Sequence, residues 1–583
     1  MIYLKRQKYI LIITGMFFRC CLFAQGITIP AGAYMVADNG NISVTRNFTN
    51  NGRFTHNGGT VVFAGSTQTL KGSSATVFKN ITVRSGSTTT ITTAGHSLTN
   101  KLLSNGALHA NGNLTLRSDA TQTAAIDGAG SGEVLGTVII QRYIASGFGY
   151  KYFSSPFQND TVGDFSNDMN LNGSFPTFYR YDENQPSNGW ISYAAGAGIL
   201  NPMHGYAANL GSSHAAKTVD LKGVVNNHTV SRTLYNHGFT YTQGFNLVGN
   251  PYPSPVNWDA AGGWTKTNID NAVYYFTAGS TDQYAGAYSS YVNGVSSDGT
   301  AGNTIAAMQG FFVHVTDGSY PVSAILAVHN TARIINPMAV FFKKNGDSEK
   351  ALLRFTAGYQ NEQLSDALTV YLDNAATGKD FNRNLDALKL LNNDPRIPNV
   401  YIKSADDRNL SIQAMSFKKD TLTRIPVELI TKKDGFIVFT AKSLDAIPDK
   451  FQVYLYDAVT MEHHDLRKNN QYTKMLISGN YSDRFFLEFR LKDQDKIEIP
   501  EPTIPNELFK IYANGNKLYV NRNVSSDTKI SISVVNMLGQ VVWKKGLNGN
   551  ITEAIPLNVA SGVYIVHVFS GTNKTSQKIF IGR

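Results

Sequence analysis

Two short stretches contain side chains of the types that bind metal ions. His463, His464 and Asp465 are consecutive, and Asp380–Asp386 (DFNRNLD) places oxygen-bearing side chains at alternate positions. Neighbouring residues of a strand point to opposite faces, so the histidine pair does not predict a shared metal ion. The second stretch lacks the glycine and the glutamate of an EF-hand. We predict no metal site and no cofactor, with a structural calcium ion at Asp380–Asp386 as an open alternative to a solvated turn.

Three tryptophans could do a different kind of chemistry. Trp190, Trp258 and Trp264 lie in a region rich in tyrosine, asparagine and aspartate. Amphipathic rings beside polar side chains can form a platform on which sugar rings stack, although aromatic residues of β-sandwiches mostly belong to the core. Asp259 and Asp270 lie near the second and third tryptophans, but the carboxylate spacing that glycoside hydrolysis needs is spatial and cannot be predicted from sequence.

No established catalytic motif accompanies these residues. The sequence contains no His-Glu-x-x-His, no Gly-x-Ser-x-Gly and no phosphate-binding loop. We therefore predict no catalytic residue, and the chain is more consistent with a protein that is not an enzyme.

The first 24 residues have the composition of a signal peptide. A basic front precedes the apolar stretch Ile10–Phe18, which is too short to span a bilayer, and cleavage is predicted after Ala24. The alternative is a membrane anchor. Both cysteines of the chain, Cys20 and Cys21, lie in this leader, so the mature protein is predicted to have no disulfide and no cysteine nucleophile.

The charge of the mature chain is mild. The whole chain has 52 basic and 42 acidic residues, and four of the basic residues lie in the predicted leader. The mature chain therefore has 48 against 42, a net charge of +6. Nucleic-acid binding needs a clustered basic face, so it is not predicted. After leader removal we predict no membrane span, because no second apolar run approaches the necessary length.

The elements that must position these residues are predicted to be strands throughout. Residues 25–140 are rich in Thr, Asn and Gly, and Asn-Gly pairs separate short alternating segments, as in NGNISV, NGRFTHNGGTVVF and NGALHANGNLTL. Asn-Gly is typical of tight turns, and strands this short and polar must stack to bury a core. We predict a β-solenoid or a meander, with an irregular Thr/Ser-rich stalk as the alternative.

Two sandwich-like regions follow. Residues 141–335 are dense in aromatic residues and poor in charge, and the three prolines of GNPYPSPVNW predict a structured loop. Residues 336–492 have more charged residues and strands such as FQVYLYDA, whose alternation suits one buried face. The only helix candidates are short, such as NLDALKLL from Asn384. Residues 493–507, rich in proline and charge, are predicted to be an extended linker.

Residues 508–583 form a compact run of predicted strands that resembles a known export module. The stretches ISISVVNMLGQVVWKKGL and IPLNVASGVYIVHV, with the last strand, resemble the type A C-terminal sorting domain of the type IX secretion system (Por secretion system) of Bacteroidota. The residues that carry the resemblance are Asn536, Gly539, Gly562, Val563, Tyr564 and Lys578. The resemblance implies an immunoglobulin-like β-sandwich. Tyr512-Ala513-Asn514-Gly515 replaces the Tyr-Pro-Asn-Pro of many members.

These observations predict an all-β, multi-domain protein that is secreted to the outer cell surface. The resemblance implies the type IX secretion and surface-attachment machinery as partners. The remaining residues, of which 138–498 resemble a recurrent region of surface proteins, favour an adhesin-like or structural role with extracellular glycans or other surface proteins as further partners. A carbohydrate-binding protein and a secreted hydrolase with an unrecognised site are the alternatives.

Overall fold

The structure is a computed structural model. It describes the chain except for residues 1, 7–8, 13–21, 174, 336–349, 363, 377, 417–422, 445–446, 492–508, 523–529, 537–539, 548–553, 571–572 and 583. Residues 2–6, 9–12, 22–24, 510, 521–522, 547, 570 and 573–574 are described by their backbone alone. The predicted linker 493–507 and the side chains of the predicted signal peptide thus lie outside the described residues. The chain divides into two compact units, residues 1–492 and 493–583.

The described residues confirm the all-β prediction. They form strands and two single 3-10 turns, η1 (Val162–Phe165) and η2 (Asn330–Ala332), and no α-helix is present among them. In the part of the chain that the structure describes, no helix has the length and apolar character needed to cross a membrane.

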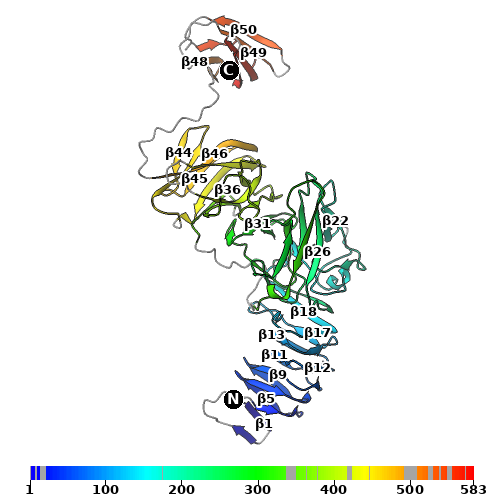
Figure 1. Cartoon of the computed structure of the whole chain (residues 1–583). Coiled ribbons are helices and arrows are strands. Elements are labelled where there is room, and N and C mark those ends of the chain that lie inside the picture. Colours follow the sequence, from blue (N-terminus) through cyan, green and yellow to red (C-terminus); the bar gives the residue numbers. More distant parts are fainter. Residues whose placement is uncertain are drawn as a thin grey trace. The chain divides into compact units, whose positions relative to one another are not determined.

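The first unit begins as a parallel β-solenoid, whose coils are stacked in blue and cyan in Figure 1. One parallel sheet contains β4 (Ile27–Ile29), β7 (Phe48–Asn50), β10 (Thr67–Lys71), β12 (Thr88–Ile91), β14 (Ala107–His109) and β17 (Glu133–Leu135). A second contains β3 (Leu22–Ala24), β6 (Asn41–Val44), β9 (Thr60–Phe63), β11 (Val77–Val83), β13 (His96–Ser104), β15 (Leu114–Leu116) and β18 (Thr137–Ile144), with β16 (Ala125–Ile126) beside β13. A third sheet contains β1 (Ile2–Arg6), β2 (Tyr9–Ile12), β5 (Tyr34–Asp38) and β8 (Arg53–Asn57).

Stacking buries the apolar residue of each short strand. Phe48, Leu70 and Ile91 are register partners in successive coils, and all three are fully buried. The ring of Phe48 also contacts the rings of Phe54 and Phe78, with centroids 5.6 and 5.9 Å apart. A single strand of three to five residues cannot bury such a side chain, so neighbouring coils supply the core.

Most Asn-Gly pairs of the solenoid do not form the tight turns that the sequence predicts. Only Asn111-Gly112 has positive φ at both residues, as a tight hairpin turn requires. In Asn105-Gly106, the Asn105 Oδ1 accepts the Ser131 N–H of the next coil at 3.1 Å. A Cβ on Gly106 would lie 2.2 Å from the Ser87 carbonyl oxygen of the preceding coil. This pair therefore joins coils, because glycine permits their close approach and asparagine bonds across it.

Antiparallel sheets follow the solenoid, starting with β25 (Lys217–Val224) against β18. One contains β19 (Tyr150–Phe153), β24 (Tyr206–Asn209), β21 (Phe178–Tyr181) and β22 (Trp190–Ser192). A second contains β27 (Phe245–Gly249), β34 (Gly310–His314), β30 (Val273–Ala278), β31 (Gly286–Val292) and β32 (Val295–Ser296), and a third contains β26 (Val230–Asn236), β35 (Val322–Val328) and β29 (Trp264–Thr267). Two short pairs are β20 (Asp160–Thr161) with β23 (Ile199–Leu200), and β28 (Val256–Asn257) with β33 (Thr304–Ile305).

One eleven-stranded sheet completes the first unit. Its order is β44 (Glu462–Asp465), β43 (Phe451–Asp457), β46 (Gly479–Leu491), β41 (Thr423–Thr431), β39 (Asn399–Lys403), β40 (Asn409–Met415), β37 (Ser365–Leu372), β36 (Leu352–Tyr359), β42 (Gly435–Lys442) and β45 (Gln471–Leu476), with β38 (Ala387–Leu388) beside β40.

The short helix predicted from Asn384 is wrong. Ala387 and Leu388 pair with β40 instead, and the Leu388 N–H donates to the Tyr274 hydroxyl at 2.9 Å. Leu385 and Leu388 are both buried. A tertiary partner on the sheet therefore overrides the helix propensity of this segment.

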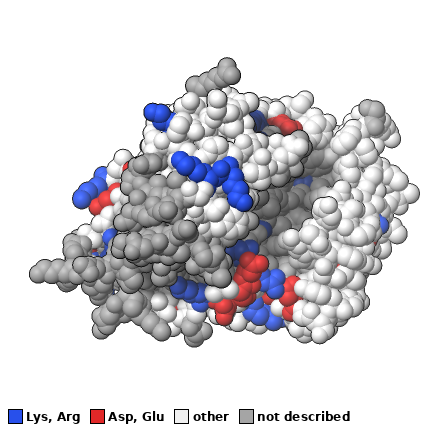
Figure 2. All heavy atoms as spheres, turned by 90° about the horizontal axis from the view of Figure 1, so that it is seen from above, with Lys and Arg blue, Asp and Glu red and all other residues white. Residues whose placement is uncertain are grey.

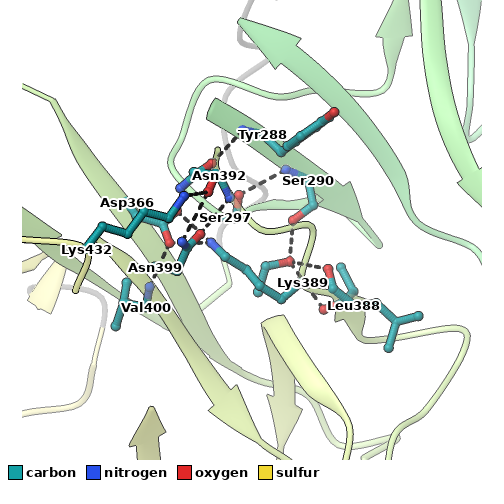
Figure 3. A network of polar contacts seen from close by, with 12 residues as sticks. Tyr288, Ser290, Ser297, Asp366, Leu388, Lys389, Asn392, Asn399, Val400 and Lys432 are labelled. Atoms are coloured by element: carbon teal, nitrogen blue, oxygen red, sulfur yellow. Dashed lines mark hydrogen bonds and ion pairs between the residues drawn. The ribbon is translucent and has the colours of Figure 1, made fainter. Parts of the chain in front are cut away.

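The predicted sandwich regions share a core and a polar junction. One apolar cluster contains Phe276 and Phe312 of the middle region together with Phe355 and Phe439 of the large sheet. At the junction, Asn392 and its neighbours meet β31 (Figure 3). The Tyr288 N–H donates to the Asn392 Oδ1 at 3.1 Å, which satisfies a donor of β31 beyond Tyr291 and Val292, the two residues that pair with β32.

The C-terminal unit is a sandwich of two antiparallel sheets. One contains β47 (Phe509–Asn514), β48 (Lys517–Arg522) and β51 (Ala554–Pro556). The other contains β50 (Val541–Leu547), β49 (Ile530–Val535), β52 (Gly562–Ser570) and β53 (Asn573–Ile581). Alternate residues of both sheets, such as Leu518, Ile532 and Val566, form its own core.

Candidate functional site

The residues predicted to carry the sorting signal lie around the second sheet of the C-terminal unit. Asn536 follows Val535, the last residue of β49, and its Oδ1 accepts the N–H of Gln540, the residue before β50, at 3.0 Å. Gly539 lies between them, outside the described residues. Asn536 and Gln540 belong to the stretch ISISVVNMLGQVVWKKGL, which contributes to the resemblance.

The other predicted signal residues lie on β52 and β53. Gly562 and Val563 begin β52 opposite Ile581 and Phe580 at the end of β53. Tyr564 is buried, and its hydroxyl donates to the Ala560 carbonyl at 2.8 Å, which anchors the strand to the loop before it. A Cβ on Gly562 would meet only the Tyr564 ring, at 3.7 Å, so the local structure does not require glycine there.

The outer face of this sheet is basic and apolar. Lys578 is exposed opposite Ile565, and Phe580 is 66% exposed. Residues 510–582 contain eight Lys and Arg and two Asp and Glu. Outside them and the predicted leader, the chain has 40 of each, so the net charge of the predicted mature chain resides in this module.

On the face seen in Figure 2, Lys and Arg form small separate groups, some of them beside Asp and Glu, and most of the described surface is uncharged.

The structure separates the three predicted stacking tryptophans. Trp258 and Trp264 pack together, with centroids 4.8 Å apart, whereas Trp190 packs on Tyr181 in another core. Trp258 is 1% exposed, and the Lys266 Nζ lies 3.6 Å from the centroid of its ring. Trp264 is half-buried and lines an open hollow of about 590 Å³, so it is the one best placed to meet a ligand.

The two aspartates near these tryptophans have partners within the fold. The Asp259 carboxylate accepts the Tyr291 hydroxyl and, at 3.0 Å, the Asn303 amide. Asp270 is buried and pairs with the His314 Nδ1 at 2.5 Å. They lie in different contacts and do not form a pair of facing carboxylates.

The two possible metal-binding stretches are held by other contacts. His463 lies against Tyr456, with stacked rings 4.3 Å apart, whereas the His464 ring bonds to the Asn469 carbonyl. Both oxygens of the buried Asp386 accept main-chain N–H groups, from Asn382 and Ala414 at 2.7 Å each. Within the described ranges, no three His, Asp or Glu side chains gather as metal ligands would. Calcium at Asp380–Asp386 stays a prediction.

A further cleft, which no sequence motif indicates, lies in the middle region. It is open, has a volume of about 480 Å³, and is lined by residues of β21, β24, β26 and β27 and their loops. Its charged and aromatic lining includes Arg180, Glu183, His204, Arg232, Tyr235 and His237. These residues come from segments more than 20 residues apart, which the antiparallel pairing brings together.

The closely spaced strands β21, β24 and β27 form the floor of the cleft. Arg180 on β21 is the register partner of Tyr206 on β24. A Cβ on Gly205 would lie 2.5 Å from the Val248 carbonyl oxygen on β27, so glycine lets these strands approach. That approach places the loop before β24 next to β26.

A carboxylate orients one histidine of the cleft. Glu183 is 4% exposed, and its Oε2 lies 2.5 Å from the His237 Nδ1. Its Oε1 also accepts the His237 N–H at 3.1 Å and the Thr242 hydroxyl at 3.3 Å. The His237 ring stacks on Phe239. Because Nδ1 faces the carboxylate, Nε2 is the ring nitrogen left for a ligand.

A second histidine is neutral. The His204 Nδ1 lies 3.1 Å from the Pro202 carbonyl oxygen, which can only accept, so this nitrogen carries the proton. Burial, helped by the charges of Arg232 and Arg180, lowers the pKa of His204 to about 4. At neutral pH the cleft therefore holds an uncharged imidazole beside two guanidinium groups.

The two arginines differ in their partners. The Arg180 Nη1 lies 3.3 Å from the Asp182 Oδ2. The Arg232 Nη1 donates to the carbonyl oxygens of Met203 and Leu247, at 3.3 and 3.0 Å, and burial lowers the pKa of this arginine to about 10. The cleft thus combines two guanidinium groups, the carboxylates of Asp182 and Glu183, aromatic rings and oriented histidines, and a polar ligand with an anionic group could meet the arginine donors that the carboxylates leave unused.

Comparison with known proteins assigns both units. Residues 26–489 match the family described as "Domain of unknown function (DUF8693)". The chain belongs to this DUF8693 family. Residues 510–582 match the "Secretion system C-terminal sorting domain", which confirms the predicted module. The protein is therefore exported by type IX secretion to the cell surface or the extracellular space.

Other comparisons add little to the DUF8693 assignment. No curated protein matches the chain. A solved structure described as "Biofilm associated protein - BSP domain" is 10% identical, with a TM-score of 0.11. The match covers 77% of this chain and 64%, less than two thirds, of that one, and at this TM-score it supports no conclusion.

Proposed function

We propose that the protein is an adhesin of the cell surface, in which the DUF8693 region holds an extracellular ligand. The observation that carries the proposal is the open cleft around Arg180 and Arg232, on a chain whose sorting domain delivers it outside the cell. Its lining joins charged groups to aromatic rings, as ligand sites do. The solenoid favours an additional structural role, because its stacked coils form a repetitive scaffold next to the region that contains the cleft.

Cell attachment tests the adhesive role. A strain without the protein is compared with strains that express the full chain or a control in which an unrelated domain precedes residues 508–583. The control is exported by the same module and lacks the DUF8693 region. We expect attachment to pectin-coated and mucin-coated wells to fall without the protein and to return only with the full chain. Equal attachment of all strains would overturn the proposal.

The Glu183–His237 contact favours a second candidate, a secreted hydrolase. A carboxylate that orients an imidazole is one part of general-base catalysis, with Nε2 placed to accept a proton from water. Release of reducing ends from pectin by the purified full-length chain, lost in His237→Asn, would support hydrolysis. Binding without release would support the adhesin alone.

A further inference from the structure

Arg232 is a half-buried guanidinium that the Asp182 charge reaches but that has no carboxylate within ion-pair distance among the described residues. Its side chain donates hydrogen bonds to two main-chain carbonyls, those of Met203 and Leu247. A guanidinium has five N–H donors, and both of these bonds use Nη1, so Nη2 and Nε can serve another acceptor. Holding a cation away from water without an anionic partner is costly, and a ligand that brought a negative charge would lower that cost.

Arg180 adds a second cation close by. Its side chain is 41% exposed, and it meets Asp182 through one nitrogen at 3.3 Å. The charges of Arg180 and Arg232 both act on His204 and on Tyr206, which places the two guanidinium groups around the same part of the cleft. The other carboxylate of the lining, Glu183, is occupied by His237 and Thr242.

We propose that this cleft binds the anionic group of an acidic saccharide, a carboxylate or a sulfate ester, through Arg232 and Arg180. The inference rests on the adhesive role proposed above and names its ligand class. Guanidinium groups bind planar carboxylates and sulfate oxygens through paired N–H donors, with a geometry that a lysine cannot copy.

The remaining lining suits a sugar rather than a free anion. Tyr235 is 44% exposed and presents an aromatic ring to the cleft, and the half-buried Tyr193 stacks on Tyr206 with centroids 6.0 Å apart. Tyrosine rings contact the apolar face of a sugar, while hydroxyl and amide groups meet its polar edge. The Asn246 side chain also lines the cleft, and its amide is fixed by the carbonyls of Tyr235 and Gly244.

Calorimetry on the purified full-length chain tests the ligand class. The probes are tetragalacturonic acid, its full methyl ester, and a chondroitin sulfate tetrasaccharide. The ester has the same skeleton without charge, so it is the matched control for the carboxylate. We expect saturable binding of the acid and at least about tenfold weaker binding of the ester, because charge-assisted hydrogen bonds would be lost. Comparison of the two acidic probes decides between carboxylate and sulfate.

Variants locate the site. Arg232→Gln and Arg180→Gln should each weaken binding of the acidic probe about tenfold or more, whereas Arg117→Gln, on an exposed solenoid residue, should leave it unchanged. Circular dichroism and thermal melting establish that each variant is folded. If Arg232→Gln does not fold, the binding affinity of Arg180→Gln decides the result. No saturable binding of either acidic probe, equal binding of the ester, or wild-type affinity in Arg180→Gln would overturn the inference.

The outcomes separate the inference from the adhesive role. If purified protein fails to bind the acidic probes while attachment still depends on the DUF8693 region, the ligand class is wrong and the adhesin proposal stands. If the purified protein binds the acid but cells attach equally without it, the cleft is a saccharide site and the adhesive role is wrong.

Discussion

Replacing Lys389 by methionine should strongly destabilise the first unit. Lys389 and Asp366 form a buried ion pair in the large sheet (Figure 3). The side chains are 2% and 3% exposed, and the Lys389 Nζ lies 2.6 and 2.5 Å from the two oxygens of Asp366. The Val400 N–H also donates to the Asp366 Oδ2 at 2.8 Å. Methionine has a similar volume, so the variant removes the charge and leaves Asp366 without its cation.

The expected loss is about 3 kcal/mol. Breaking a buried pair by removing one partner typically costs about 3–5 kcal/mol, because the remaining charge is uncompensated. The Val400 N–H still solvates Asp366, which favours the lower end of that range. The double variant Asp366→Leu/Lys389→Met leaves no buried charge and should be more stable than Lys389→Met alone. The more exposed pair Lys433–Glu362, whose side chains are 42% and 26% exposed and lie 2.7 Å apart, is the control, and Lys433→Met should cost less than about 1 kcal/mol.

Urea unfolding and hydrogen exchange measure this loss. Since a unit of this size need not unfold in one step, exchange of the Val400 amide gives the local free energy directly. A loss below about 1 kcal/mol in Lys389→Met, or a double variant less stable than the single one, would refute the reasoning that burial makes this charge expensive.

Three further predictions concern pH, export and redox state. Burial raises the pKa of Asp160 to about 7, so this carboxyl should lower the free energy of unfolding progressively as the pH rises from about 4 to 7. The variant Asp160→Asn should therefore be more stable than wild type by up to about 4 kcal/mol at pH 8 but not at pH 4. Urea unfolding at both pH values measures this, and an equal effect at both would contradict it. Deleting residues 508–583 should leave the protein in the periplasm, and surface labelling that still finds the truncated chain would rule this out. Dithiothreitol should not change the melting temperature of the mature chain, since Cys20 and Cys21 lie in the predicted leader, and a clear fall would show that they are retained and bonded.

Local patterns in the sequence predict much of this architecture. Alternating short strands between Asn-Gly pairs predict stacking, because such strands cannot bury Phe48 or Leu70 alone. The role of Asn105-Gly106 is not predictable in the same way. The sequence suggests a hairpin turn, while the preceding coil supplies the steric limit on Gly106 and the next coil supplies the hydrogen-bond donor to Asn105.

The helix predicted from Asn384 fails for a related reason. The run of leucines and charged residues suits a helix by propensity, but pairing with β40 and the bond to the Tyr274 hydroxyl decide its conformation. Both partners lie outside the segment, and the tyrosine is 114 residues from Leu388. Propensity measures what an isolated segment prefers, so it cannot include such partners.

The two functional parts of the chain differ in how far sequence can identify them. The sorting module depends on a continuous pattern, in which Asn536, Gly562 and Lys578 keep their places along a few neighbouring strands. Tryptophan was the residue type that suggested a glycan site, yet burial removes Trp258 from contact with ligands. Arg180 and Arg232, by contrast, have no local signature.

The charge of the cleft explains why composition did not reveal it. Arg180 and Arg232 belong to a region whose basic and acidic residues balance, so net charge carries no sign of an anion site. What makes Arg232 unusual is its surroundings: two carbonyls bind it where a carboxylate would ordinarily do so. Such a mismatch between a charged group and its partners becomes visible only when β26 and β27 are placed side by side. A guanidinium with unused donors and no ion-pair partner is therefore a better guide to an acidic ligand than the net positive charge of the sorting module.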